Sequence, residues 1–125
     1  MMKTVLVIED NQDNLELITI ALRRSGYKVI SAETGENGVA IAIEEKPFFI
    51  VMDIDLPGID GFEATRRIRA SSANGDTPII AITSFAMRGD QEKIMKIGCN
   101  GYFEKPINPL TIVDDINKII KELGT

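Results

Sequence analysis

Two acids near the start of the chain and three polar residues further along it could work together on one ligand: Glu9, Asp10, Asp53, Thr83 and Lys105. Carboxylates held about 4 Å apart repel by roughly 4 kcal/mol at an effective dielectric constant near 20, so a cluster of them needs a cation. Because the chain has no histidine and a single cysteine, its oxygen donors favour Mg²⁺ (or Mn²⁺) over zinc. Thr83 and Lys105 are suited to hold a phosphoryl oxygen by hydrogen bond and charge. The set therefore predicts phosphoryl chemistry at a hard-metal site.

A further acid follows the most central of these residues. In the stretch IVMDIDLPGID, residues 50–60, Asp55 stands two positions after Asp53. The pair has two interpretations: a phosphatase nucleophile with its general acid, or one reactive aspartate with a neighbour. The spacing alone leaves both open.

Apolar runs of strand length alternate with helical periodicity five times along the chain. The predicted strands lie at 4–10, 27–32, 48–53, 77–84 and 101–105, and the predicted helices at 11–26, 37–46, 63–71, 90–98 and 108–124. Asn11 or Asp13 can cap the first helix, and Pro109 stands in the first turn of the last. Each of the candidate site residues falls at or just after the end of a predicted strand.

This order of elements predicts an α/β fold of the doubly wound (βα)5 type, a three-layer sandwich. Parallel strands need crossover connections, and right-handed crossovers place helices on both faces of the sheet. Ligands in such sheets bind at the carboxyl ends of the strands, near the point where the strand order reverses. The five candidate residues are thus expected to meet at one edge of the sheet.

Size and composition set further limits. The 125 residues fit a single domain over 1–125 with a true core. A net charge of −5 argues against binding to nucleic acid or to an anionic membrane, which both need clustered Lys and Arg. Cys99 has no partner for an intramolecular disulfide, and no apolar run approaches the roughly 20 residues that span a bilayer. We therefore expect a cytoplasmic protein.

Four segments carry a resemblance to a known family. VLVIEDN, MDIDLPGIDGFE, PIIAITSFA and GYFEKPI stand in the order and at the spacing that is typical of the receiver domain of two-component response regulators. The resemblance covers essentially the whole chain. It implies a flavodoxin-like sheet of five parallel strands in the order 2-1-3-4-5.

The resemblance also implies roles for the acids. Asp53 would be the phospho-acceptor, taking a phosphoryl group from a phosphohistidine or a small phosphodonor. Glu9 and Asp10 resemble the acidic pair that binds Mg²⁺, with Asp10 the direct ligand and Glu9 acting through water. Asp53 itself and the backbone carbonyl of Asp55 would complete the protein ligands, and the Asp55 side chain would point outward.

Further roles concern the phosphoryl group and the response to it. By the resemblance Thr83 would bond the new phosphoryl group and Lys105 would pair with it, while Lys105–Pro106 would be a cis peptide. Tyr102 matches an aromatic switch residue that moves inward when Thr83 shifts. The face formed by the fourth helix, fifth strand and fifth helix would then change its contacts with a protein target.

The implied protein is a switch and not an enzyme, since it would catalyse only its own phosphorylation and dephosphorylation. It resembles single-domain regulators of chemotaxis or cell-cycle type, and the same motifs are also compatible with a receiver excised from a hybrid kinase. Its partners would be a histidine kinase or phosphotransfer protein and a downstream protein target. We expect a monomer or weak dimer.

Two other classes of protein share part of this pattern. A haloacid-dehalogenase-type phosphatase would use Asp53 and Asp55, but its nucleophile belongs to the first strand, its core is longer, and Glu9 and Asp10 would have no role. An FMN-binding electron carrier shares the strand order, but here the loop after the first strand reads EDNQDN, whose acids repel a flavin phosphate. A separate hypothesis is that Asp55 and Phe85 tune the lifetime of the phosphoryl group.

Overall fold

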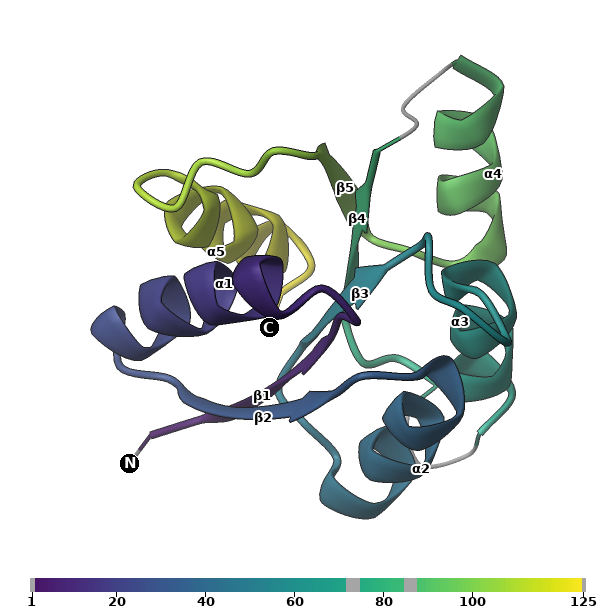
Figure 1. Cartoon of the computed structure of the whole chain (residues 1–125), viewed down its shortest axis with the longest axis horizontal. Coiled ribbons are helices and arrows are strands. Elements are labelled where there is room, and N and C mark those ends of the chain that lie inside the picture. The colour runs from purple at the N-terminus through teal and green to yellow at the C-terminus, as the bar shows by residue number, and fades with distance from the viewer. Residues whose placement is uncertain (1, 72–74, 85–87, 125) are drawn as a thin grey trace.

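Strands and helices alternate along the chain in the computed structural model, which describes residues 2–71, 75–84 and 88–124 (Figure 1). The strands are β1 (Thr4–Ile8), β2 (Lys28–Ala32), β3 (Ile50–Asp53), β4 (Ile79–Thr83) and β5 (Gly101–Glu104). The helices are α1 (Gln12–Arg24), α2 (Gly35–Glu45), α3 (Gly61–Ala70), α4 (Arg88–Ile97) and α5 (Ile112–Glu122). None of these helices has the length and apolar run that crossing a bilayer requires.

All five described strands run parallel in one sheet, in the order β2-β1-β3-β4-β5, as predicted. Helices α1 and α5 cover one face of the sheet, and α2, α3 and α4 cover the other (Figure 1). The strand order reverses between β1 and β3, so the carboxyl ends of these two strands frame the crevice in which such folds bind ligands.

The three central strands, β1, β3 and β4, are apolar on both faces because helices cover both faces of the sheet. In β1, Val5 and Val7 pack in the layer beneath α1 and α5, whereas Leu6 and Ile8 pack in the layer beneath α2 and α3. Strands β3 and β4 alternate in the same way and are buried at every position. This two-sided burial explains the unbroken apolar runs in the sequence.

Three helices begin at a side chain that accepts a backbone N–H of the first turn. Asn11 accepts from Asn14 N at 3.0 Å, Thr34 from Asn37 N at 3.1 Å, and Asp60 from Glu63 N at 2.9 Å. The Asn11 cap is one of the two that the sequence suggested. The Asp60 cap starts α3 at Gly61, two residues before the predicted boundary.

The last helix begins later than predicted, at Ile112 instead of residue 108. Asn108 forms a turn instead: its side-chain oxygen accepts from Leu110 N at 2.9 Å, and its carbonyl accepts from Ile112 N at 2.9 Å. Asparagine favours such local bonds to the backbone, which compete with a helix start. Pro109 thus lies in a turn that precedes α5.

The start of α3 lies against the end of β3 at Gly61. A Cβ atom at this position would stand 2.6 Å from the Asp53 carbonyl oxygen and 2.6 Å from Ile54 Cα. The Gly61 N–H also donates to the Ile54 carbonyl at 3.0 Å. Only glycine allows the helix to meet the strand this closely.

We predict that Gly61→Ala lowers the free energy of unfolding by about 1–3 kcal/mol, because the strand end must shift to admit the methyl group. Urea denaturation measures the loss. Gly75→Ala is the matched control, since its Cβ would meet only ordinary contacts at 3.6 Å and 3.7 Å. Equal stability changes in the two variants would contradict the close approach at Gly61.

Candidate functional site

Four parallel strands deliver the predicted site residues to one edge of the sheet. Asp53 and Thr83 are the last residues of β3 and β4, Glu9 follows β1, and Lys105 follows β5. The ladder continues past the strand ends, because Glu9 N donates to the Ala32 carbonyl at 3.0 Å and Lys105 N to the Thr83 carbonyl at 2.9 Å. The sheet therefore fixes the backbone beneath these side chains.

One ammonium joins two buried carboxylates. Lys105 Nζ lies 3.1 Å from Asp53 Oδ2 and 3.4 Å from Glu9 Oε1. The Asp53 and Glu9 side chains are only 2% and 1% exposed, whereas that of Lys105 is 18% exposed. Burial by itself would lower the pKa of Lys105, but its attraction to Asp53 and Glu9 outweighs burial and raises that pKa. The lysine therefore stays charged.

The two carboxylates respond in opposite ways to the same surroundings. Burial raises the pKa of Glu9 to about 8, and the neighbouring Asp53 carboxylate adds to the rise. Burial also acts to raise the pKa of Asp53, but contact with Glu9, the Asp55 N–H and Lys105 together lower it. In the absence of a metal, Asp53 is thus the charged member of the pair at neutral pH and Glu9 the protonated one.

Several oxygens at this edge lack a hydrogen-bond donor. Among the described residues, neither Glu9 oxygen accepts a hydrogen bond, and Asp53 Oδ2 has only its ion pair with Lys105. Glu9, Asp10 and Asp53 each offer a carboxylate oxygen, and these atoms lie within 4.8 Å of one another. Buried, unbonded carboxylate oxygens are the donors that a hard divalent cation satisfies, so the residues present fit Mg²⁺.

Asp53 is oriented by its own loop. Its Oδ1 accepts the N–H of Asp55 at 2.9 Å, while Oδ2 faces Lys105. The Asp53 carboxylate therefore has a fixed direction, which a group that reacts in line with a leaving group requires.

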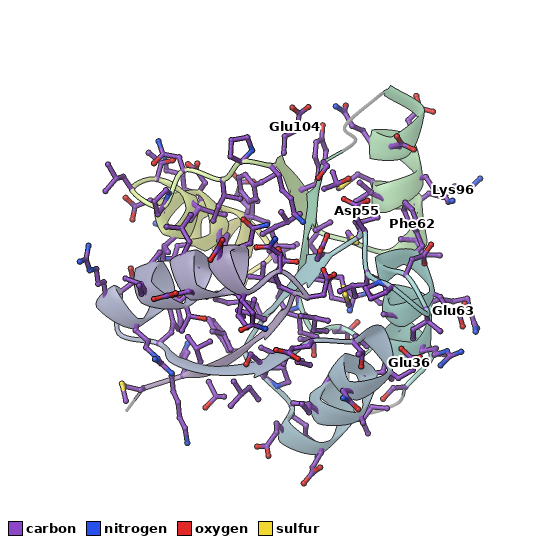
Figure 2. The ribbon with its side chains drawn as sticks, viewed as in Figure 1. Glu36, Asp55, Phe62, Glu63, Lys96 and Glu104 are labelled. Atoms are coloured by element: carbon purple, nitrogen blue, oxygen red, sulfur yellow. The ribbon has the colours of Figure 1, made fainter. Side chains whose placement is uncertain are left out.

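Asp55 makes a contact that the sequence analysis did not foresee. Its side chain is exposed, as predicted, but Oδ2 accepts the backbone N–H of Ser84 at 3.0 Å. Figure 2 shows Asp55 at the end of β3, on the side of the sheet that faces α4. The sequence signals this contact only weakly. Asp55 is an acid just after β3, and Ser84 is the first residue after the neighbouring strand β4.

The remaining predicted residues lie around this edge. Thr83 is buried, and Tyr102 is half-buried and packs against the apolar layer that contains Ile94 of α4. The Lys105–Pro106 peptide bond is cis. Phe85 lies outside the described residues. A movement of Tyr102 and Thr83 needs two states, so the switch role stays a prediction.

A family comparison covers most of the chain. Residues 5–117 match the family model of the response regulator receiver domain. The polar-differentiation response regulator DivK of Brucella anthropi is 36% identical over 120 residues, which are 96% of this chain and 98% of that protein.

Solved structures agree in fold. The receiver domain of a sensor histidine kinase from Pseudomonas aeruginosa, described with a magnesium ion in its active-site cleft, superposes with a TM-score of 0.88 at 35% identity, covering 97% of this chain and 99% of that one. The chemotaxis response regulator CheY4 of Vibrio cholerae superposes with a TM-score of 0.89 at 26% identity, covering 95% and 99%.

The raised pKa of Glu9 predicts a pH-dependent stability in the presence of a chelator. The folded chain binds this proton more tightly than the unfolded chain, so the proton's contribution to stability is complete below pH 4.5 and is lost as the pH rises towards 8. Glu9→Gln, which stays neutral, should therefore gain stability relative to the wild type across this range, by on the order of 2–3 kcal/mol.

Chemical denaturation at several pH values measures this difference. Glu44→Gln, a change at an exposed acid of α2, serves as the control and should follow the wild-type pH profile. If the Glu9→Gln profile also ran parallel to the wild type, the assignment of the proton to Glu9 would be wrong.

Proposed function

The chain belongs to the response regulator receiver domain family of two-component signalling, and from this membership we propose that Asp53 accepts a phosphoryl group from a histidine kinase or phosphotransfer protein. The observation that carries the proposal is the Asp53 carboxylate at the end of β3, held by the Asp55 N–H and paired with Lys105. A small phosphodonor such as acetyl phosphate would serve in place of the protein donor.

The proposed transfer needs few groups from the protein. A carboxylate oxygen of Asp53 forms a bond to phosphorus as the bond from phosphorus to the donor's nitrogen or oxygen breaks, and the bonding electrons leave with the donor. Lys105 would neutralise negative charge that spreads over the equatorial phosphoryl oxygens, and the hydroxyl of Thr83, at the buried end of the neighbouring strand, is proposed to bond one of them. Positioning and electrostatics thus account for the step.

Glu9, Asp10, Asp53 and the Asp55 carbonyl would hold the metal ion. When bound, Mg²⁺ supplies positive charge to the developing phosphoryl oxygens and compensates the excess of carboxylates over ammonium groups. The unbonded oxygens of Glu9 and Asp53 support this assignment.

The same geometry favours the switch over the phosphatase alternative. A general acid would have to face the leaving group, but the Asp55 carboxylate is engaged with the backbone of Ser84. The phosphatase nucleophile also belongs to a first strand, and Asp53 ends the third. Asp53 is therefore proposed as a phospho-acceptor, in a chain that catalyses only its own phosphorylation and dephosphorylation.

The proposed output is a change in protein contacts. A shift of Thr83 towards the phosphoryl group and of Tyr102 inwards would alter the face made by α4, β5 and α5, which a downstream protein can read. The relatives include a response regulator and a receiver domain of a sensor kinase, so both a stand-alone and a hybrid setting fit. We expect a cytoplasmic monomer or weak dimer.

Asp53→Asn tests the proposal directly. Incubation of the wild type with acetyl phosphate and Mg²⁺ should add the mass of one phosphoryl group, as measured by intact mass spectrometry. The adduct should be lost in Asp53→Asn, and in the wild type with excess EDTA, because the nucleophile or the charge compensation is then missing.

Asp60→Asn is the control, because it removes an acid from the same loop while keeping a side chain that caps α3. This variant should form the adduct as the wild type does. An adduct that persists in Asp53→Asn would move the acceptor to another residue, and steady turnover of a phosphate ester without any adduct would favour the phosphatase.

A further inference from the structure

The hydrogen-bond ladder between β3 and β4 ends with a change of hydrogen-bond partners. Ile54 N donates to the Ile82 carbonyl at 2.9 Å, and in a parallel pair the next bond would run from Ser84 N to the Ile54 carbonyl. The Ile54 carbonyl instead accepts from Gly61 N at 3.0 Å. Ser84 N donates to the Asp55 carboxylate at 3.0 Å. A charged side chain thus takes the place of a backbone acceptor at this rung.

Asp55 therefore contacts both neighbouring strand ends. Its N–H donates to Asp53 Oδ1 at 2.9 Å, and its carboxylate holds the first residue after Thr83. The Asp55 side chain is exposed, so hydrogen bonding and charge, not packing, keep it in this position. One residue links the proposed phospho-acceptor to the start of the connection between β4 and α4.

We propose that Asp55 is a positioning residue that holds Ser84 in the unphosphorylated chain and releases it when Asp53 is phosphorylated. The proposal rests on the proposed function. Phosphorylation replaces the single negative charge of the Asp53 carboxylate by a phosphoryl group that carries about two negative charges and three acceptor oxygens. These charges repel the Asp55 carboxylate, and the new oxygens compete with it for the Ser84 N–H.

The distribution of positive charge supports this direction. The Lys105 ammonium lies at Asp53 Oδ2, whereas the backbone N–H of Asp55 donates to Oδ1. Among the described residues no Lys or Arg side chain forms an ion pair with the Asp55 carboxylate, so no protein cation offsets its repulsion from a phosphoryl group on Asp53. Release of Ser84 frees the backbone next to Thr83, the residue proposed to bond the phosphoryl group.

Two variants separate the bond from the charge. Asp55→Ala removes the acceptor, so the amide of the exposed Ser84 should exchange its hydrogen at least about tenfold faster in the unphosphorylated protein. Asp55→Asn keeps an acceptor oxygen of the same shape without the charge, and the amide should stay protected. Hydrogen exchange followed by NMR measures both.

The release step is tested by titrating the Mg²⁺-loaded full chain with beryllofluoride, a stable analogue of the phosphoryl group on a carboxylate. The apparent Kd should fall about tenfold in Asp55→Ala, because no bond to Ser84 has to be broken, and severalfold in Asp55→Asn, because the repulsion is gone. A residue that merely supported the fold would change affinity in the opposite direction. Asp60→Asn, with the same loss of charge in the same loop, should bind as the wild type does.

Two results would overturn the proposal. Unchanged Ser84 exchange in Asp55→Ala would refute the contact, and wild-type or weaker beryllofluoride binding in both Asp55 variants would refute the release. A wild type that binds no beryllofluoride would instead refute the proposed function, and the release step with it. The two failures are therefore distinguishable.

Discussion

Two carboxylates buried side by side, with a single ammonium between them, set the chemistry of this protein. Glu9 and Asp53 are almost fully removed from solvent, and Lys105 reaches both. One positive charge is too little for two ionised acids in such a place, so in the absence of a metal a proton remains on Glu9. The folded chain thus holds more carboxylates than positive charges at this site, and a divalent cation is the ligand that would compensate the excess.

The fold supplies the rigidity that such an unfavourable arrangement needs. β1, β3 and β4 lie adjacent in the centre of the sheet, and helices bury both of their faces. A strand that is packed on both faces cannot shift to bring an unpaired charge at its end closer to solvent. The packing of the apolar layers therefore offsets the unfavourable free energy of burying the acids. The backbone at the edge of the sheet keeps its geometry as a result.

The sequence was sufficient for the elements whose signal is local and repeated. The five apolar runs predicted the strands, and the acids at their ends predicted the cluster that the structure brings within 4.8 Å. It was insufficient where two competing local interactions had to be weighed. Asn108 could begin a helix or close a turn, and its bonds to Leu110 and Ile112 decide for the turn. The Asp55–Ser84 hydrogen bond joins residues that are 29 positions apart. It depends on the register between β3 and β4, which the local sequence of either strand does not determine.

The close meeting of Gly61 with the end of β3 also limits how the chain can vary in length. Between Ile54 and Gly61 the backbone leaves the sheet and returns to donate a hydrogen bond to the residue from which it left. An inserted residue would break that closure or push a side chain into the strand. The segment between Ile54 and Gly61 therefore has a fixed length. Variation next to the site at this point has to come from substituted side chains and not from a longer loop.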